Sequence, residues 1–197
     1  YVCTNRSMMN QAPMKIPPQA KQVFKGVIFD VYQWEQPGFD GRSLTFEMLK
    51  RPSTVQIIAT DGTHIMLSEE EQPMKGPFIS LLGGRQEENE TPLDGAKREL
   101  LEESGYASDD WELLSSSDPY TKMEWTVYTY IARNCRKIQE QKLDSGEKIS
   151  LRRVTFEEFC AFVFSEKFYG REFAFDLLYM KCFAPKKLEE FRKRLGI

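Results

Sequence analysis

Three glutamates, Glu99, Glu102 and Glu103, lie close together near the middle of the chain. Their i, i+3, i+4 spacing places all three carboxylates on one face of a helix. Like charges held so closely repel one another, so a positive group must compensate them. Arg98 can pair with one carboxylate. A divalent cation is the natural partner for the others, because hard oxygen ligands suit magnesium or manganese. The alternative is a solvated acidic face, which is what a run of charges usually means.

The residues around these glutamates form a longer pattern, G-x5-E-x7-R-E-U-x-E-E-x-G-U, in which U is a bulky aliphatic residue. The chain matches it at Gly84, Glu90, Arg98, Glu99, Leu100, Glu102, Glu103 and Gly105. Tyr106 departs mildly at the last position, since tyrosine can still fill an apolar site. So many fixed positions are far more specific than a lone glycine motif. The segment resembles the Nudix box, which favours the metal-binding interpretation over the solvated face.

The resemblance implies an enzyme that hydrolyses a nucleoside diphosphate linked to another group, X, with Mg2+ or Mn2+ as cofactor. By position, Glu99 and Glu103 match the principal metal ligands, and Glu102 matches a further or shared ligand. Gly83 matches a residue that offers its backbone carbonyl to the metal. Glu102 and Glu103 are thereby also predicted to take part in catalysis.

Other positions of the box are expected to shape the scaffold. Arg98 and Glu90 match an ion pair that braces the loop against the helix, while Gly84 and Gly105 would serve backbone geometry. The catalytic base lies outside the box. Residues 144–147 resemble a D-x-G-E segment of the ADP-ribose pyrophosphatase branch, which makes Glu147 the candidate base. The alternative is that Glu147 is an ordinary turn residue.

Several features favour ADP-ribose or a nucleotide sugar as the substrate, giving NMP and X-phosphate. Pro119 stands where the ADP-ribose branch typically has a proline. The segment 22–52 resembles the strands with which that branch forms a homodimer. Trp34 is a candidate for base stacking, and Arg51 and Arg85 are candidates for phosphate binding. Lys75 departs from the branch, which often has an arginine there, so the pocket is expected to differ.

Alternative functions remain open. The chain could cleave a dinucleoside polyphosphate, a nucleoside triphosphate or a capped RNA end, although no basic run supports RNA. It could instead be a non-catalytic module that senses a nucleotide, but such modules generally lose the glutamates. A purely structural interaction domain would leave the carboxylate face unexplained.

Length, composition and charge limit the classes of protein and function that the chain can have. The chain has 197 residues, of which 41% are hydrophobic and 29% charged, and its net charge is −3. These values suit one globular domain and disfavour broad nucleic-acid binding. No apolar run is long enough to span a membrane, and a cytoplasmic setting is the default. Four cysteines without C-x-x-C spacing are expected to be reduced thiols rather than zinc ligands.

Residue patterns predict strands and helices along most of the chain. Strands are expected at 23–34, 44–49, 54–59, 65–67, 78–82, 111–114, 126–132 and 148–154. The main helix is expected to begin after Thr91, with Pro92 at its first position, and to end at Gly105. Further helices are expected at 155–164, 173–183 and 187–195.

This order of elements, together with the Nudix resemblance, predicts an α+β fold. It would be a Nudix-type α/β/α sandwich with a mixed sheet and an N-terminal β-hairpin extension. Residues 1–20 are expected to form a flexible arm and residues 21–197 the Nudix domain. Within that domain, residues 22–52 would contribute to the dimer and residues 168–197 would form the C-terminal helices.

Overall fold

The computed structural model describes residues 15–143 and 145–197, which form two compact units. The first unit, as far as it is described, runs from residue 15 to Pro52 and includes Asp118–Thr126. The second unit comprises Ser53–Ser117 and Val127–Ile197, and it contains the whole carboxylate motif. Residues 1–14 of the predicted arm lie outside the described residues, and the predicted domain boundaries stay a prediction.

The first unit is a four-stranded sheet in the order β1-β2-β3-β9. Its strands are β1 (Lys21–Lys25), β2 (Asp30–Pro37), β3 (Ser43–Lys50) and β9 (Met123–Glu124). β2 and β3 form the predicted antiparallel hairpin. The single strand predicted at 23–34 is wrong, because a turn divides it into β1 and β2. In that turn the Gly26 amide donates to the Phe29 carbonyl at 3.0 Å and lies 3.3 Å from the Asp30 carboxylate.

The second unit is built on a seven-stranded mixed sheet in the order β13-β6-β5-β4-β10-β8, with β12 paired to β5. The strands are β4 (Thr54–Thr60), β5 (Ile65–Gln72), β6 (Lys75–Ser80), β8 (Asp110–Ser117), β10 (Val127–Arg133), β12 (Lys148–Val154) and β13 (Phe168–Tyr169). β10 runs parallel to β4 and β13 parallel to β6, while the other pairs are antiparallel. A small separate ladder joins β7 (Tyr106–Ala107) to β11 (Arg136–Lys137).

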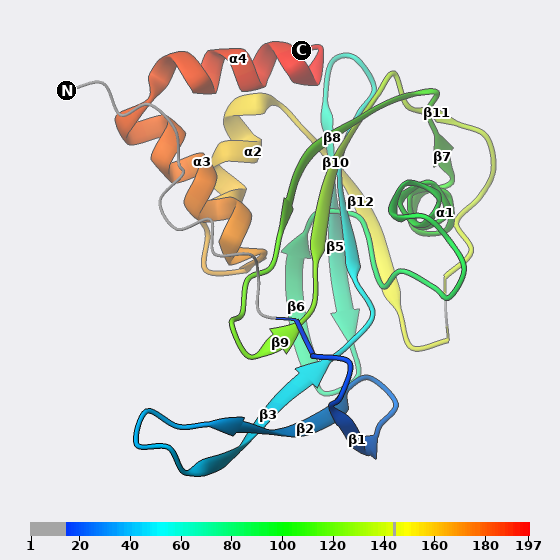
Figure 1. The fold of residues 1–197 in the computed structure, drawn as a ribbon. Helices are drawn as coiled ribbons and strands as arrows, with labels where there is room; N and C mark the ends of the chain where they lie inside the picture. The colour runs from blue at the N-terminus through cyan, green and yellow to red at the C-terminus, as the bar shows by residue number, and fades with distance from the viewer. Residues whose placement is uncertain (1–14, 144) are drawn as a thin grey trace. The chain divides into compact units, whose positions relative to one another are not determined.

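Helices cover both faces of this sheet (Figure 1). The α1 face carries α1 (Pro92–Ser104), and the α2 face carries α2 (Phe156–Val163), α3 (Arg171–Phe183) and α4 (Pro185–Leu195). Alternate side chains of β4 enter two separate cores. Ile57 packs with Leu100 of α1, whereas Ile58 packs with Phe159 and Leu177 on the other side. The predicted α+β sandwich with a mixed sheet is confirmed.

Local signals set the ends of α1. The Thr91 side chain accepts the Asp94 amide at the N-cap, and Pro92 occupies the first turn. Gly105 ends the helix in the left-handed conformation at φ 73°. A Cβ there would lie 2.1 Å from the Gln139 carbonyl oxygen, so only glycine fits. The helix therefore begins and ends where the sequence predicts.

Two remaining expectations concern cysteines and membranes. Cys135 and Cys160 are buried and Cys182 is exposed, and all three are free thiols. Cys3 lies outside the described residues. Within the described ranges, no helix is both long and apolar enough to cross a bilayer.

Candidate active site

Glu103 is a buried carboxylate at the C-terminal end of α1. The residue is only 5% exposed, and its Oε2 accepts the backbone N–H of Gly83 at 2.7 Å. Burial raises its pKa well above the usual range, and the nearby charges of Glu99, Glu70 and Glu147 raise it further. The loop between β6 and α1, which contains Gly83 and Gly84, therefore contacts a carboxylate whose negative charge is poorly compensated.

Glu99 lies one turn earlier on the same helix face and is also largely buried. Burial raises its pKa to about 7, although the neighbouring Arg98 guanidinium opposes that shift. The loop passes so close to Glu99 that a Cβ on Gly84 would lie 2.5 Å from Glu99 Oε1. Glycine at position 84 thus lets the backbone reach the carboxylate.

Arg98 is the main cation of this helix face. Its Nη2 donates to Glu90 Oε1 at 2.8 Å, and its Nε donates to Glu90 Oε2 at 3.2 Å. Its Nη1 donates to Glu99 at 2.9 Å and to Glu102 at 3.0 Å. The carbonyl of Arg85 accepts Nη2 at 3.0 Å, so the same guanidinium also ties the loop to the helix. The two bonds from Arg98 to Glu90 lower the pKa of the Glu90 carboxyl.

The donor set suits a divalent cation held by few protein ligands. Arg98 contacts three carboxylates but not Glu103. Among residues 15–143 and 145–197, no three histidine, cysteine, aspartate or glutamate side chains form a ready-made metal cage. Magnesium does not require one, because it usually keeps several waters and binds one or two carboxylates plus substrate phosphates. Glu103 is buried, the Glu99 side chain is 13% exposed, and both carboxyls have raised pKa values, which suits such ligands.

Glu147 is an exposed residue directly before β12. Its charge contributes to the raised pKa values of Glu99 and Glu103, which places it near the α1 carboxylates. Asp144 of the same predicted segment lies outside the described residues. The charge of Glu147 thus acts on both box glutamates, and its role as base stays a prediction.

The three predicted substrate residues fall in different units. Arg85 belongs to the second unit, where it is exposed and forms a β-bridge with Thr54. Trp34 and Arg51 belong to the first unit. The Trp34 ring packs against Phe46 with centroids 4.9 Å apart. Arg51 stacks on Trp125, with the guanidinium carbon 4.7 Å from the ring centroid. Their roles in substrate binding stay predictions.

Sequence reasoning missed Glu70, an additional carboxylate whose charge acts on Glu103. It lies in β5, and its Oε1 accepts the hydroxyls of Ser68 at 2.7 Å and Ser80 at 2.5 Å. The predicted strand ended at Leu67, so it did not include Glu70. The alternation of Met66, Ser68 and Glu70 along one face was the signal that could have found it.

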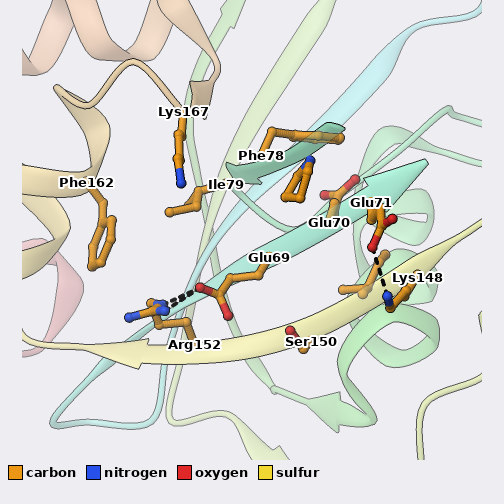
Figure 2. A pocket seen from close by; sticks show the side chains of 12 residues that line it. Glu69, Glu70, Glu71, Phe78, Ile79, Lys148, Ser150, Arg152, Phe162 and Lys167 are labelled. Carbon is orange, nitrogen blue, oxygen red and sulfur yellow. Dashed lines mark hydrogen bonds and ion pairs between the residues drawn. The ribbon is translucent and has the colours of Figure 1, made fainter. Parts of the chain in front are cut away.

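The α2 face of the same strands bears an open pocket of about 490 Å³. Figure 2 shows two ion pairs across its floor, Glu69 with Arg152 and Glu71 with Lys148, while Glu70 points away from Arg152. The Lys148–Glu71 distance is 2.8 Å. Glu69 and Glu71 therefore each have their own basic partner on this face.

Comparisons with known proteins agree with this geometry. The chain is 26% identical over 167 residues to an ADP-ribose pyrophosphatase of Bacillus subtilis (strain 168), covering 82% of this chain and 89% of that protein. It is 24% identical to a methanol dehydrogenase activator of Bacillus methanolicus, covering 83% of this chain and 90% of that protein. A crystal structure of an ADP compounds hydrolase superposes with a TM-score of 0.70 over 91% of this chain and 95% of that chain, at 17% identity.

The family comparison covers most of the second unit. The NUDIX domain family matches residues 50–175, well over half of the chain, and the match contains α1 with its loop and β12. The buried carboxylates and the bracing arginine lie within this range. The chain therefore belongs to the NUDIX domain family and is a Nudix hydrolase.

Proposed function

We propose that this protein hydrolyses the diphosphate bond of ADP-ribose, or of a closely related nucleoside diphosphate sugar, with a divalent metal ion as cofactor. The observation that carries the proposal is the pair of carboxylates largely shielded from solvent, Glu99 and Glu103, of which Arg98 contacts only the first. Buried charges require pairing or a metal. Similarity to an ADP-ribose pyrophosphatase supports the choice of substrate.

Glu99 and Glu103 would hold the metal, with Glu102 and the Gly83 carbonyl as further ligands. When bound, Mg2+ or Mn2+ neutralises diphosphate charge and lowers the pKa of a coordinated water. The Gly83 amide fixes one oxygen of Glu103 and leaves its other oxygen for the cation. Arg98 holds Glu99 and Glu102 on the same side of the helix and anchors the loop through Glu90.

The reaction is a displacement at phosphorus. A water oxygen bonds to one phosphorus, the bridging phosphorus–oxygen bond breaks, and the bridging oxygen leaves with the other phosphate. Glu147 takes the proton from the attacking water, a role that suits an exposed carboxylate near the α1 glutamates. For ADP-ribose the products are AMP and ribose 5-phosphate.

The substrate's ends would be bound outside the carboxylate face. Arg85 is a phosphate ligand in this proposal because its side chain is exposed beside the anchored loop. Trp34 would stack on the nucleobase, and Arg51 would be a further phosphate ligand. Residues 22–52 would form a homodimer, an arrangement supported by the exposed apolar side chains of Phe24, Val27 and Ile28.

The test is release of nucleoside monophosphate from a panel of diphosphates, separated by ion-exchange chromatography. The panel comprises ADP-ribose, ADP-glucose, GDP-mannose, UDP-glucose, NADH, diadenosine polyphosphates and nucleoside triphosphates, each with Mg2+, with Mn2+ and with chelator. We expect AMP from ADP-ribose, with kcat/KM above that for the other substrates, and no product with chelator. Tight binding of one nucleotide without cleavage would contradict the proposal and indicate a sensor instead.

A further inference from the structure

Glu70 is held by two buried serines on adjacent strands. Ser68 of β5 and Ser80 of β6 stand opposite each other in the ladder, with their hydroxyl oxygens 2.8 Å apart. Both hydroxyls also donate to Glu70 Oε1. A carboxylate that accepts two buried hydroxyls has little freedom to turn, and the Glu70 charge acts on Glu103.

This network continues directly into the site. Ser80 ends β6, and the chain then passes through Leu81 and Leu82 to Gly83, whose amide binds Glu103. Two further bonds fix this segment on β4, from Ile57 N to the Leu82 carbonyl at 2.8 Å and from Val55 N to the Gly84 carbonyl at 2.9 Å. Glu70 thus anchors the start of a short segment whose end positions a buried carboxylate.

We propose that Glu70 is a positioning residue for the metal site. Through Ser80, Glu70 fixes the segment that holds Glu103. Its own negative charge also attracts a divalent cation to the part of the site that faces β5. This inference rests on the proposed metal-dependent function. Glu70 acts through Glu103 and the cation and need not contact the substrate.

The strand supplies a matched control for this role. Glu69 and Glu70 are neighbours on β5 with the same charge, but Glu69 pairs with Arg152 on the α2 face (Figure 2). Glu70→Gln removes the charge while its amide oxygen can still accept both serine hydroxyls. Ser80→Ala keeps the charge and removes one of the two bonds that orient it. Glu69→Gln removes the same charge from the opposite face.

The experiment is Mn2+ titration of each variant, followed by the electron paramagnetic resonance signal of free Mn2+, with the Mg2+ dependence of hydrolysis measured in parallel. We expect Glu70→Gln to weaken Mn2+ binding roughly 10-fold, as loss of a group supporting metal ligands typically does. Its kcat at saturating Mg2+ should stay within about threefold of wild type. Ser80→Ala should weaken binding by a smaller factor, and Glu69→Gln by less than about twofold.

The outcomes separate this inference from the proposed function. If wild type binds Mn2+ and hydrolyses ADP-ribose, but Glu70→Gln and Glu69→Gln bind Mn2+ equally well, Glu70 has no positioning role. If Glu70→Gln lowers kcat without changing Mn2+ affinity, the inference also fails. Absence of both Mn2+ binding and hydrolysis in wild type would instead overturn the proposed function. Circular dichroism of each variant checks that the fold is retained.

Discussion

Acidic side chains on the two faces of the central sheet differ in burial and in ion pairing. On the α2 face, Glu69 and Glu71 of β5 are partly exposed or exposed, and each pairs with its own cation, Arg152 or Lys148. On the α1 face, Glu103 is buried and has no basic partner among the residues that the structure describes. Solvent and direct pairing explain the first arrangement completely, whereas the second retains an electrostatic cost that a bound cation would remove.

The contrast shows that the number of acidic residues alone does not identify a metal site. Three consecutive glutamates in β5, residues 69–71, are as dense as those of α1. On α1, burial and like charge together raise the pKa values of the carboxylates, to about 7 for Glu99. Burial without full pairing, rather than charge density, distinguishes the candidate site.

Removing the buried carboxylate should have the largest effect. We expect Glu103→Gln to lower kcat/KM for ADP-ribose on the order of 10³-fold, a loss of ~4 kcal/mol of transition-state stabilisation. The fold should be retained, because the amide oxygen of the substituted side chain could still accept the Gly83 N–H. Steady-state assays with Mg2+ measure the effect, and Glu71→Gln on the α2 face is the control. Activity above a tenth of wild type in Glu103→Gln would refute the assignment.

Removing the shared cation should be the next largest effect, on stability. Arg98→Met leaves Glu90, Glu99 and Glu102 without this partner. The network is partly exposed, so we expect a loss of ~2 kcal/mol, between that of an exposed pair and that of a buried one. Arg152→Met removes a partly exposed pair with Glu69 and should cost less than ~1 kcal/mol. Urea denaturation near neutral pH compares the two variants. An equal loss in the free energy of unfolding in both variants would mean that the two faces do not differ electrostatically.

The metal-free protein should lose stability as pH rises. The pKa of Glu99 is 4.5 in an unfolded chain and about 7 in the fold, so between these values the folded state binds more protons. The free energy of unfolding therefore falls from pH 4.5 to 7, by up to ~3 kcal/mol. Thermal unfolding in chelator across this range tests the sign. Glu99→Gln should flatten the profile, and a wild-type stability that rises over this range would contradict the account.

Removing the candidate base should lower turnover by a smaller factor than removing Glu103. We expect Glu147→Gln to lower kcat about 10²-fold with little change in KM, which is typical of losing a general base. Glu140→Gln, which alters an exposed glutamate paired with Lys137, serves as the control in a nearby loop. A drop of less than about fivefold in Glu147→Gln would assign the base to another residue.

Breaking an ion pair on the α2 face should have the smallest effect. Lys148 and Glu71 are both exposed, so Lys148→Ala should change the free energy of unfolding by less than ~1 kcal/mol. The Mg2+ dependence of hydrolysis should not change. A large shift in metal dependence would show that the two faces are coupled through β5 and β12.

Features with strong local signals were predictable from sequence. Thr91, Pro92 and Gly105 define the ends of α1 through their own side chains and dihedral angles, and the structure has them in those places. The glutamate spacing on this helix was equally local. The two-sided sheet followed from the order of strands and helices.

Features that depend on distant contacts were not predictable. The predicted strand ended at residue 67, yet residues 68–72 extend β5 because β6 and β12 pair with them. Glu70 was missed for that reason. The sequence suggested one carboxylate partner for Arg98, but packing of the loop on the helix gives it three. In both cases tertiary pairing decided the outcome.

The most direct test of the central claim is the Mn2+ affinity of three proteins measured side by side near neutral pH. These are wild type, the α1-face double variant Glu99→Gln/Glu103→Gln, and the α2-face double variant Glu69→Gln/Glu71→Gln. We predict that wild type and the α2-face variant bind Mn2+ with similar affinity and that the α1-face variant loses binding. Equal binding by all three proteins, or loss only in the α2-face variant, would contradict the account.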